Sequence, residues 1–558
     1  MRFVPILFAL LLLAGPALAQ SDLQPVAPVV ACSDLTAIDL TGIGGAGSAV
    51  SAAQETTSDG IAVCSVTGAL APQLNFQVLL PMATWTQRYL QVGCGGLCGN
   101  ISLRSGASAG CQVLNDGGFV MSATDICHSG MGAEWGLDDG PRTDFAHRSQ
   151  HITALAVKAL TQAFYGQTPA YSYFNGCSDG GREALMEAMR YPDDFDGIIA
   201  GAPVMLFTVQ NTLHHGWLAR ANTDADGKAI LLSDKLPALH APVIAACDAQ
   251  DGLADGLISQ PALCAFDPAA LQCADGADDA TCLTAPEVAV VREVYGGPRD
   301  ASGVVLTAGQ PLPGSEPEWQ GVFVPDTAGM PPFSKMITEP VLQNLAFDPA
   351  RPQMTLADLD FSTATLDALR ARHPQIDTTN PDLSAFEASG GQLILWRGLA
   401  DPHIAPANTL ALHRAMIATM GAETVAGFNR LYPIPGMAHC GGGRGPSEFD
   451  LLTPMLAWVE TGVALGAILP ATTAKESTFG QPDGGDSGHG GMPPSADLGV
   501  APLPDMTRPV WPWPATARYI GSSDPNVSAS WTQGPDAETV ALRDRAGADF
   551  FSPYTPEN

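Results

Sequence analysis

Segments with strand-like and helix-like patterns alternate between residues 76 and 200, and this alternation constrains the possible fold more than any other feature. Short apolar segments predict strands, and segments with apolar residues at helical spacing predict helices. The predicted strands are 76–80, 88–92, 118–123, 171–174 and 197–200, and the predicted helices are 151–165 and 181–190. The alternation resumes with a strand at 392–396, a helix at 405–420 and a strand at 429–432. Such a pattern is typical of a parallel sheet covered by helices.

A long segment of different composition separates the two alternating regions. Residues 205–385 are rich in Asp, Pro and Ala, and strand–helix alternation fades there. Because 558 residues exceed one ordinary domain, an insertion is expected. We predict an α/β domain made of residues 20–204 and 386–558, with 205–385 as an inserted domain. Residues 470–500, rich in Gly, Asp, Ser and Pro, predict an exposed loop.

The N-terminus has the pattern of a signal peptide. One Arg precedes an apolar run from Phe3 to Ala14, and Ala17 and Ala19 supply small residues at the cleavage positions. A membrane anchor is the alternative, but the run is too short to span a bilayer comfortably. We predict that residues 1–19 are removed and that the protein is secreted or periplasmic.

The charge of the chain limits its partners. A formal net charge of −31 argues against binding of nucleic acid or anionic membranes. No stretch after the N-terminal run is apolar enough to span a bilayer. We therefore predict neither a nucleic-acid nor a membrane partner.

Twelve cysteines follow the predicted signal peptide, and export permits disulfides. The sequence does not determine their connectivity. Two close pairs, Cys247 with Cys264 and Cys273 with Cys282, suggest local bridges. Cys32 and Cys64 are also expected to be disulfide-bonded. No cysteine and histidine spacing typical of a zinc site is present.

Residues 176–180 form a G-x-S-x-G motif around Ser178. A predicted strand precedes the motif and a predicted helix follows it, which is the setting of a nucleophile elbow. The glycines are needed because the turn is tight. A glycine-rich structural turn is the alternative. The context favours Ser178 as a catalytic nucleophile.

A serine nucleophile needs a base and a residue that orients the base. His439 lies in a loop just after a predicted strand, and Asp401 follows another predicted strand. The order Ser, Asp, His along the chain is that of α/β-hydrolases. His403 is a rival base, which we interpret as a loop or helix-start residue. We predict a triad of Ser178, His439 and Asp401 on an α/β-hydrolase fold with a large inserted domain.

Two cysteines flank the predicted catalytic residues. Cys177 precedes Ser178, and Cys440 follows His439. A bridge between them would hold both catalytic loops together. The alternatives are two unrelated cysteines, or Cys177 as the nucleophile, which the orientation of an elbow disfavours.

An oxyanion hole needs two backbone N–H groups. The residue after the nucleophile, Asp179, is expected to supply one. The loop after the strand at 88–92 is expected to supply the other, through Gly95 or Gly96. A flexible glycine turn is the alternative explanation of this loop.

Several stretches together resemble the tannase and feruloyl esterase family, which includes mono(2-hydroxyethyl) terephthalate hydrolase. They are 89–93 with the glycine loop after it, 173–183, 190–192, 195–203, 398–402, 436–440, 507–509 and 512–514. The resemblance covers most of the mature chain. It implies that Cys177 and Cys440 form a disulfide and that the inserted domain is a lid over the active site.

The same resemblance implies a structural Ca²⁺ in the lid, at 248–257. Its ligands would be the carboxylates of Asp248, Asp251 and Asp255 and the carbonyls of Leu253 and Leu257. Calcium prefers six to eight hard oxygens from a tightly turning chain. The alternative is a cluster of Asp-Gly turns joined by a disulfide.

This chain departs from the family pattern in two places. Trp511 and Trp531 stand where the family often has a disulfide in the tail, so that bridge is expected to be absent. Extra cysteines surround the predicted oxyanion loop, and their pairing stays open: 94, 98, 111 and 127.

The resemblance implies a serine carboxylesterase that forms an acyl-enzyme and acts on esters of aromatic carboxylic acids such as hydroxycinnamates or gallates. Aromatic residues of the insertion could stack on such a ring, although a place in the lid core is the favoured interpretation for each: Trp217, Phe323, Phe333 and Phe347. The alternatives are a terephthalate monoester hydrolase, a general carboxylesterase, a peptidase on the same fold, and a non-catalytic binding protein.

Overall fold

The computed structural model describes most of the chain, namely residues 20–274, 276–473, 498–521, 523–537 and 542–556. The predicted signal peptide and most of the loop predicted at 470–500 lie outside the described residues. Within the described part, no helix is long and apolar enough to cross a membrane.

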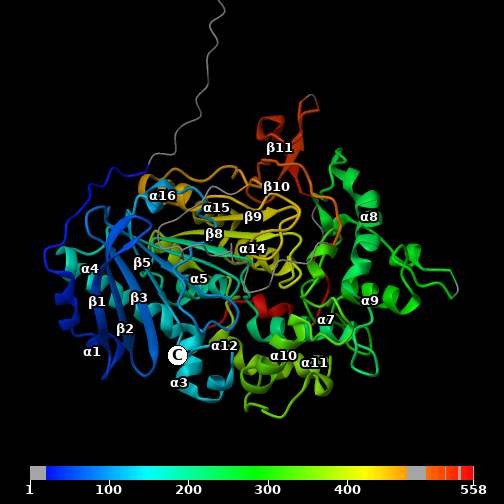
Figure 1. Cartoon of the computed structure of the whole chain (residues 1–558), viewed down its shortest axis with the longest axis horizontal. Helices are drawn as coiled ribbons and strands as arrows, with labels where there is room; N and C mark the ends of the chain where they lie inside the picture. The colour runs from blue at the N-terminus through cyan, green and yellow to red at the C-terminus, as the bar shows by residue number, and fades with distance from the viewer. Residues whose placement is uncertain (1–19, 275, 474–497, 522, 538–541, 557–558) are drawn as a thin grey trace, which may run out of the picture.

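A nine-stranded sheet forms the centre of the molecule (Figure 1), in the order β1-β2-β3-β5-β4-β6-β7-β8-β9. The strands are β1 (Ala49–Ser58), β2 (Ile61–Leu70), β3 (Leu74–Pro81), β4 (Arg88–Val92), β5 (Phe119–Thr124), β6 (Tyr171–Cys177), β7 (Gly197–Gly201), β8 (Gln392–Gly398) and β9 (Asn429–Ile434). Strands β4 to β9 run parallel to one another. Strands β1, β2 and β3 are antiparallel to their neighbours, so the sheet is mostly parallel, as predicted, with an antiparallel portion at one edge.

The antiparallel part arises because short turns connect its first strands. Asp59 and Gly60 join β1 to β2, and both have positive φ (48° and 79°). A two-residue turn of this kind joins antiparallel strands, whereas parallel strands need a long crossover.

Helices cover both faces of the sheet. The long ones are α4 (Ser149–Tyr165), α5 (Asp179–Arg190), α14 (Ala407–Met420) and α16 (Leu452–Thr461), and shorter ones include α1 (Thr41–Gly44), α2 (Gln112–Asn115), α3 (Asp139–Thr143) and α15 (Ala422–Phe428). Successive side chains of β6 point to opposite faces of the sheet. Phe174 packs in the core under α4 and α5, whereas Tyr173 packs in the core under α16. Residues near the C-terminal end form a small two-stranded sheet, β10 (Ala515–Tyr519) with β11 (Trp531–Asp536).

Between β7 and β8 the described residues form helices and loops and add no strand to the central sheet. The helices are α6 (Phe207–Val209), α7 (His215–Ala221), α8 (Leu236–Cys247), α9 (Ala285–Gly296), α10 (Phe333–Asn344), α11 (Thr363–Leu369), α12 (His373–Ile376) and α13 (Ser384–Ala388). Figure 1 shows α7 to α11 gathered beside the sheet. Part of this segment packs around its own core, which includes Leu239, Val291 and Trp319. That residues 205–385 form a separate domain and a lid stays a prediction.

Candidate active site

Ser178 occupies a sharp turn between β6 and α5. Its backbone has φ 64° and ψ −118°, which a residue with a side chain adopts only at a cost. Neighbouring glycines make the turn possible, because a Cβ on Gly176 would lie 2.4 Å from the carbonyl oxygen of Gly180. The backbone N–H of Ser178 donates to the carbonyl of Gly201 at the end of β7 (3.0 Å). The motif therefore has the strand–turn–helix geometry of a nucleophile elbow.

The structure brings the three predicted triad residues together. Asp401 follows β8 and His439 follows β9, so both lie at the edge of the sheet where β6 ends at Ser178. His439 Nε2 lies 2.9 Å from Ser178 Oγ. His439 Nδ1 lies 2.8 Å from Asp401 Oδ2. A continuous hydrogen-bond chain thus runs from the serine hydroxyl to the buried carboxylate.

Asp401 is fully buried and has several donors. Its Oδ1 accepts the backbone N–H groups of His403 (2.8 Å) and Ile404 (3.0 Å), and Arg397 Nη2 donates to its Oδ2 (3.2 Å). Burial alone would raise the pKa of the carboxyl, but the nearby His439 and Arg397 outweigh burial and hold the pKa of Asp401 below its ordinary value. Asp401 therefore stays ionised and able to orient His439.

Arg397 is a residue of this site that the sequence did not reveal. It is buried in β8, and its guanidinium also donates to the carbonyl of Ile404 (2.6 Å) and to Thr409 Oγ1 (2.9 Å). The guanidinium therefore fixes the loop that carries Asp401. The only feature of the sequence that points to this contact is the spacing of four residues between Arg397 and Asp401, which is a weak indication.

His403 lies against His439, but the ring that reaches Ser178 Oγ is that of His439. Its ring centroid is 4.9 Å from that of His439 and 4.9 Å from that of Phe333 in α10. Burial lowers the pKa of His403 to about 3, so the ring is neutral. It occupies the loop before α14, as interpreted from the sequence. Its ring lies between His439 and Phe333 of α10.

The cysteines beside Ser178 and His439 form a disulfide. Cys177 and Cys440 have a Cα–Cα distance of 5.9 Å and are separated by 263 residues in the sequence. The bond ties the end of β6 to the loop after β9. It therefore links the residues next to Ser178 and His439 covalently, and Cys177 is not a free thiol.

Replacing both Cys177 and Cys440 with Ser should lower stability and activity together. A bridge that closes so long a loop contributes roughly 2–4 kcal/mol, and its loss frees the two catalytic loops. Thermal unfolding and ester turnover of the purified double variant measure the two effects. Free thiols at both positions in the native protein, found by peptide mapping, would contradict the assignment.

The other predicted disulfides are present as well. One further disulfide joins two of the four cysteines whose pairing the sequence left open. The disulfides are Cys32–Cys64, Cys247–Cys264, Cys273–Cys282 and Cys94–Cys98. Cys111 and Cys127 are buried free thiols. Burial raises the pKa of the Cys111 thiol to about 12, so it is unreactive as a thiolate.

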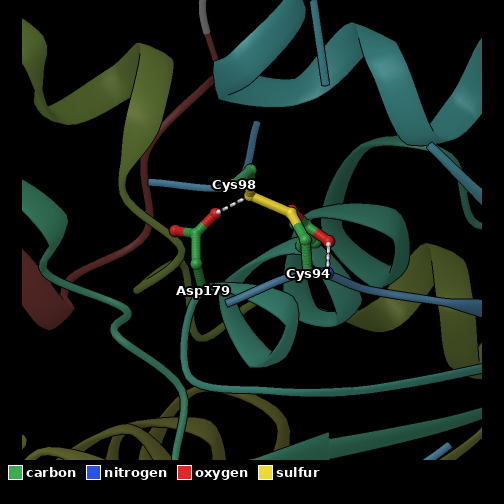
Figure 2. A group of neighbouring side chains, drawn as sticks. Cys94, Cys98 and Asp179 are labelled. Atoms are coloured by element: carbon green, nitrogen blue, oxygen red, sulfur yellow. Dashed lines mark hydrogen bonds between the residues drawn. A yellow bond between two sulfur atoms is a disulfide. The ribbon is translucent and has the colours of Figure 1, made fainter. Parts of the chain in front are cut away.

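The loop with Gly95 and Gly96 lies beside Asp179, as an oxyanion hole requires. Both glycines stand between the bridged Cys94 and Cys98, and Cys98 Sγ is 3.5 Å from Asp179 Oδ2 (Figure 2). The Asp179 carboxylate forms a buried ion pair with Arg182, whose Nε lies 2.7 Å from Oδ1. Asp179 stands at the N-terminus of α5, where backbone N–H groups favour negative charge. The assignment of Asp179 and of either glycine as donors stays a prediction.

The segment predicted to bind calcium forms a compact turn after α8. Asp248 Oδ2 accepts the N–H of Gly256 (2.8 Å), and Asp255 Oδ1 accepts the N–H of Leu257 (3.2 Å). Asp255 is also paired with the buried Arg508. The carboxylates of Asp248 and Asp255 thus converge on one turn and offer hard oxygens that fit Ca²⁺, although Arg508 already supplies positive charge there. The side chain of Asp251 lies outside the described part.

Comparisons with known proteins agree with this geometry. The chain matches the family model for tannase and feruloyl esterase over residues 58–533. The mono(2-hydroxyethyl) terephthalate hydrolase of Piscinibacter sakaiensis is 31% identical, over 84% of this chain and 84% of that protein. A probable feruloyl esterase B-2 of Aspergillus flavus is 32% identical, over 70% of this chain and 75% of that protein. The structure of feruloyl esterase B from Aspergillus oryzae superposes with a TM-score of 0.74 at 24% identity, covering 90% of this chain and 99% of that chain. The structural match shows a shared α/β-hydrolase fold.

Proposed function

This chain belongs to the tannase and feruloyl esterase family and is a carboxylic ester hydrolase, and on that premise we propose that it cleaves esters of aromatic carboxylic acids through Ser178, His439 and Asp401. The observation that carries the proposal is the hydrogen-bond chain from Ser178 Oγ through His439 to Asp401, with distances of 2.9 and 2.8 Å. A complete chain of this kind has no use in a binding protein, so it argues against the non-catalytic alternative.

The proposed reaction proceeds through an acyl-enzyme. Ser178 Oγ attacks the ester carbonyl carbon while His439 Nε2 takes the hydroxyl proton. The negative charge on the carbonyl oxygen is stabilised by the N–H of Asp179 and by an N–H of the glycine loop. His439 then gives its proton to the leaving alcohol. A water molecule, activated by the same histidine, releases the acid and restores Ser178.

The four aromatic residues considered in the inserted segment differ in whether they lie in the hydrophobic core or beside the catalytic residues. Phe323 and Phe347 are buried members of the hydrophobic cores, and Trp217 packs on Phe361. Phe333 is only half-buried, and its ring packs on His403 beside His439. Phe333 is therefore the member of the four that we propose contacts an aromatic acyl group.

A terephthalate monoester needs a cation for its free carboxylate. The arginines bonded to residues of the described site, Arg182 and Arg397, are buried in ion pairs with Asp179 and Asp401. Neither is available to a substrate carboxylate, which favours a neutral aromatic acyl group.

We expect methyl ferulate or methyl gallate to have a higher kcat/KM than p-nitrophenyl octanoate. The aromatic ring of the substrate can stack on the rings of Phe333 and His403, whereas the long flexible acyl chain of the octanoate gains less from contact with two aromatic rings. The measurement is kcat/KM for these three esters and for a terephthalate monoester. Fastest turnover of the octanoate, by a wide margin, would identify a general lipase-like esterase instead.

We further propose that the turn at residues 248–257 binds one structural Ca²⁺. Removing the ion with a chelator should lower the melting temperature, because three acidic residues in one short segment repel one another without a cation. The loss is about 3 kcal/mol when free calcium is about 100-fold above its Kd. Excess calcium should restore the melting temperature. Absence of calcium by metal analysis, with no thermal response to the chelator, would contradict the site.

Export of the protein is the remaining proposal. The structure contains five disulfides, which persist in oxidising compartments. N-terminal sequencing of the protein released by its host tests whether cleavage follows Ala19.

A further inference from the structure

In the loop between β4 and α2, Leu97 and Cys98 are buried in the core, but Gly95 and Gly96, the expected oxyanion donors, have no side chains that could pack there. Gly95 is exposed and Gly96 is half-exposed. Neither has a side chain, and glycine has more backbone freedom than any other residue. An oxyanion donor nevertheless has to be held within a fraction of an ångström of its working position. Something outside these two residues has to hold the loop.

A short disulfide closes the loop on itself. Cys94 and Cys98, separated by four residues, are bonded with a Cα–Cα distance of 5.4 Å. Figure 2 shows this bond beside the Asp179 carboxylate, with Cys98 as the nearer of the two cysteines. The bond forms a small ring that contains both glycines, so it removes most of their conformational freedom.

Glu183 holds the loop from the protein interior. It lies on α5, one turn beyond Asp179, and is almost fully buried (3% exposed). Its Oε2 accepts the backbone N–H of Cys94 (3.1 Å) and the side-chain amide of Gln150 (2.7 Å). Its Oε1 lies 2.8 Å from Cys94 Sγ and 3.4 Å from Cys98 Sγ. Glu183 therefore contacts both halves of the disulfide and the backbone between β4 and the ring.

The environment of Glu183 suits a neutral carboxyl. Burial raises its pKa well above the ordinary value, and the nearby Asp179 raises it further. A protonated carboxyl can approach the electron-rich sulfurs closely, whereas an anion would be repelled. Gln150 is itself held by Gln91 of β4, whose amide donates to the Gln150 carbonyl (2.9 Å). The contacts thus connect α5, α4 and β4 to the loop.

We propose that Glu183 and the Cys94–Cys98 disulfide together form a brace that positions the oxyanion loop beside Asp179 for ester hydrolysis. This inference rests on the proposed function, and it makes the three residues positioning residues rather than catalytic ones. An oxyanion donor acts mainly on the transition state, so a loosened loop lowers kcat and leaves KM nearly unchanged.

The test compares four variants with the wild type. Cys94→Ser/Cys98→Ser removes the ring, and Glu183→Ala removes the interior support. Glu183→Gln keeps a neutral group whose amide oxygen can still accept the Cys94 N–H. Cys273→Ser/Cys282→Ser is the matched control, because it removes another short disulfide from the inserted segment. Each variant is assayed for kcat and KM with a p-nitrophenyl ester, for the rate of phosphonylation by a serine-reactive phosphonate, and for thermal stability.

We expect the first two variants to lose about 10- to 100-fold in kcat, because complete loss of one oxyanion donor costs about 100- to 1000-fold. KM should change by no more than about two-fold, the phosphonylation rate should fall in parallel with kcat, and Glu183→Gln should recover most of the loss. The control should retain its kcat even if its melting temperature falls. The brace is refuted if Cys94→Ser/Cys98→Ser keeps wild-type kcat, or if the control loses kcat equally. Activity that survives Ser178→Ala would instead refute the proposed function, so the two failures are distinguishable.

Discussion

Replacing Ser178 with Ala should lower ester turnover about a million-fold while the protein stays folded. The hydroxyl is the only group of the proposed mechanism that forms a covalent bond to the acyl carbon, and its Oγ makes the hydrogen bond to His439 Nε2. Alanine is also compatible with the tight turn, because it adds no atoms to it. Steady-state turnover of methyl ferulate and the melting temperature measure the two expectations.

The matched control for this variant is Ser302→Ala. Ser302 is an exposed serine of the inserted segment that contacts Asp300. It should retain full turnover. Residual activity above a few per cent in purified Ser178→Ala would contradict the assignment of the nucleophile.

Asp401→Asn should lower kcat about 10,000-fold, the second largest effect that we expect. The amide has the shape of the carboxylate, but it cannot stabilise the protonated ring of His439 and favours the wrong ring tautomer. The change also leaves the buried Arg397 without its anionic partner, so the variant should unfold at a lower temperature.

A second variant separates these two consequences. Arg397→Met removes the ion pair without changing the acidic group, so its loss of activity should be far smaller than that of Asp401→Asn. Rate constants and melting temperatures of both variants make the comparison. More than one-tenth of wild-type kcat in folded Asp401→Asn would contradict the role of Asp401.

The strands and helices with strong periodicity could be predicted from the sequence. The strand at 88–92 matches β4 residue for residue, and the helix predicted at 151–165 differs from α4 by two residues at one end. Neither β1 nor β2 was predicted, and β1 gave little signal because its residues are small or polar and mostly exposed, so no apolar alternation marks it. The Asp59-Gly60 pair was an available signal for the hairpin, since this dipeptide suits a two-residue turn.

The meeting of Ser178, His439 and Asp401 could be predicted because each follows a predicted strand, and the ends of parallel strands lie at one edge of the sheet. The supporting residues could not be predicted in this way. Glu183 and Arg397 act through contacts between elements, with the loop at Cys94 and with the carbonyl of Ile404. Their sequence neighbourhood is that of an ordinary helix and an ordinary strand, so neither attracts attention before the fold is known. The spacing of Cys94 and Cys98 was compatible with a bridge, but four unpaired candidates left it open.

Mass spectrometry after reaction with a serine-reactive phosphonate identifies the nucleophilic residue without assuming a substrate. The reagent forms a bond only to a serine whose hydroxyl is activated by a base and whose oxyanion hole is in place. We predict one phosphonate per chain, attached to Ser178, with ester turnover lost in proportion to labelling. A label on any other residue, or an active enzyme that the reagent does not modify, would contradict the account.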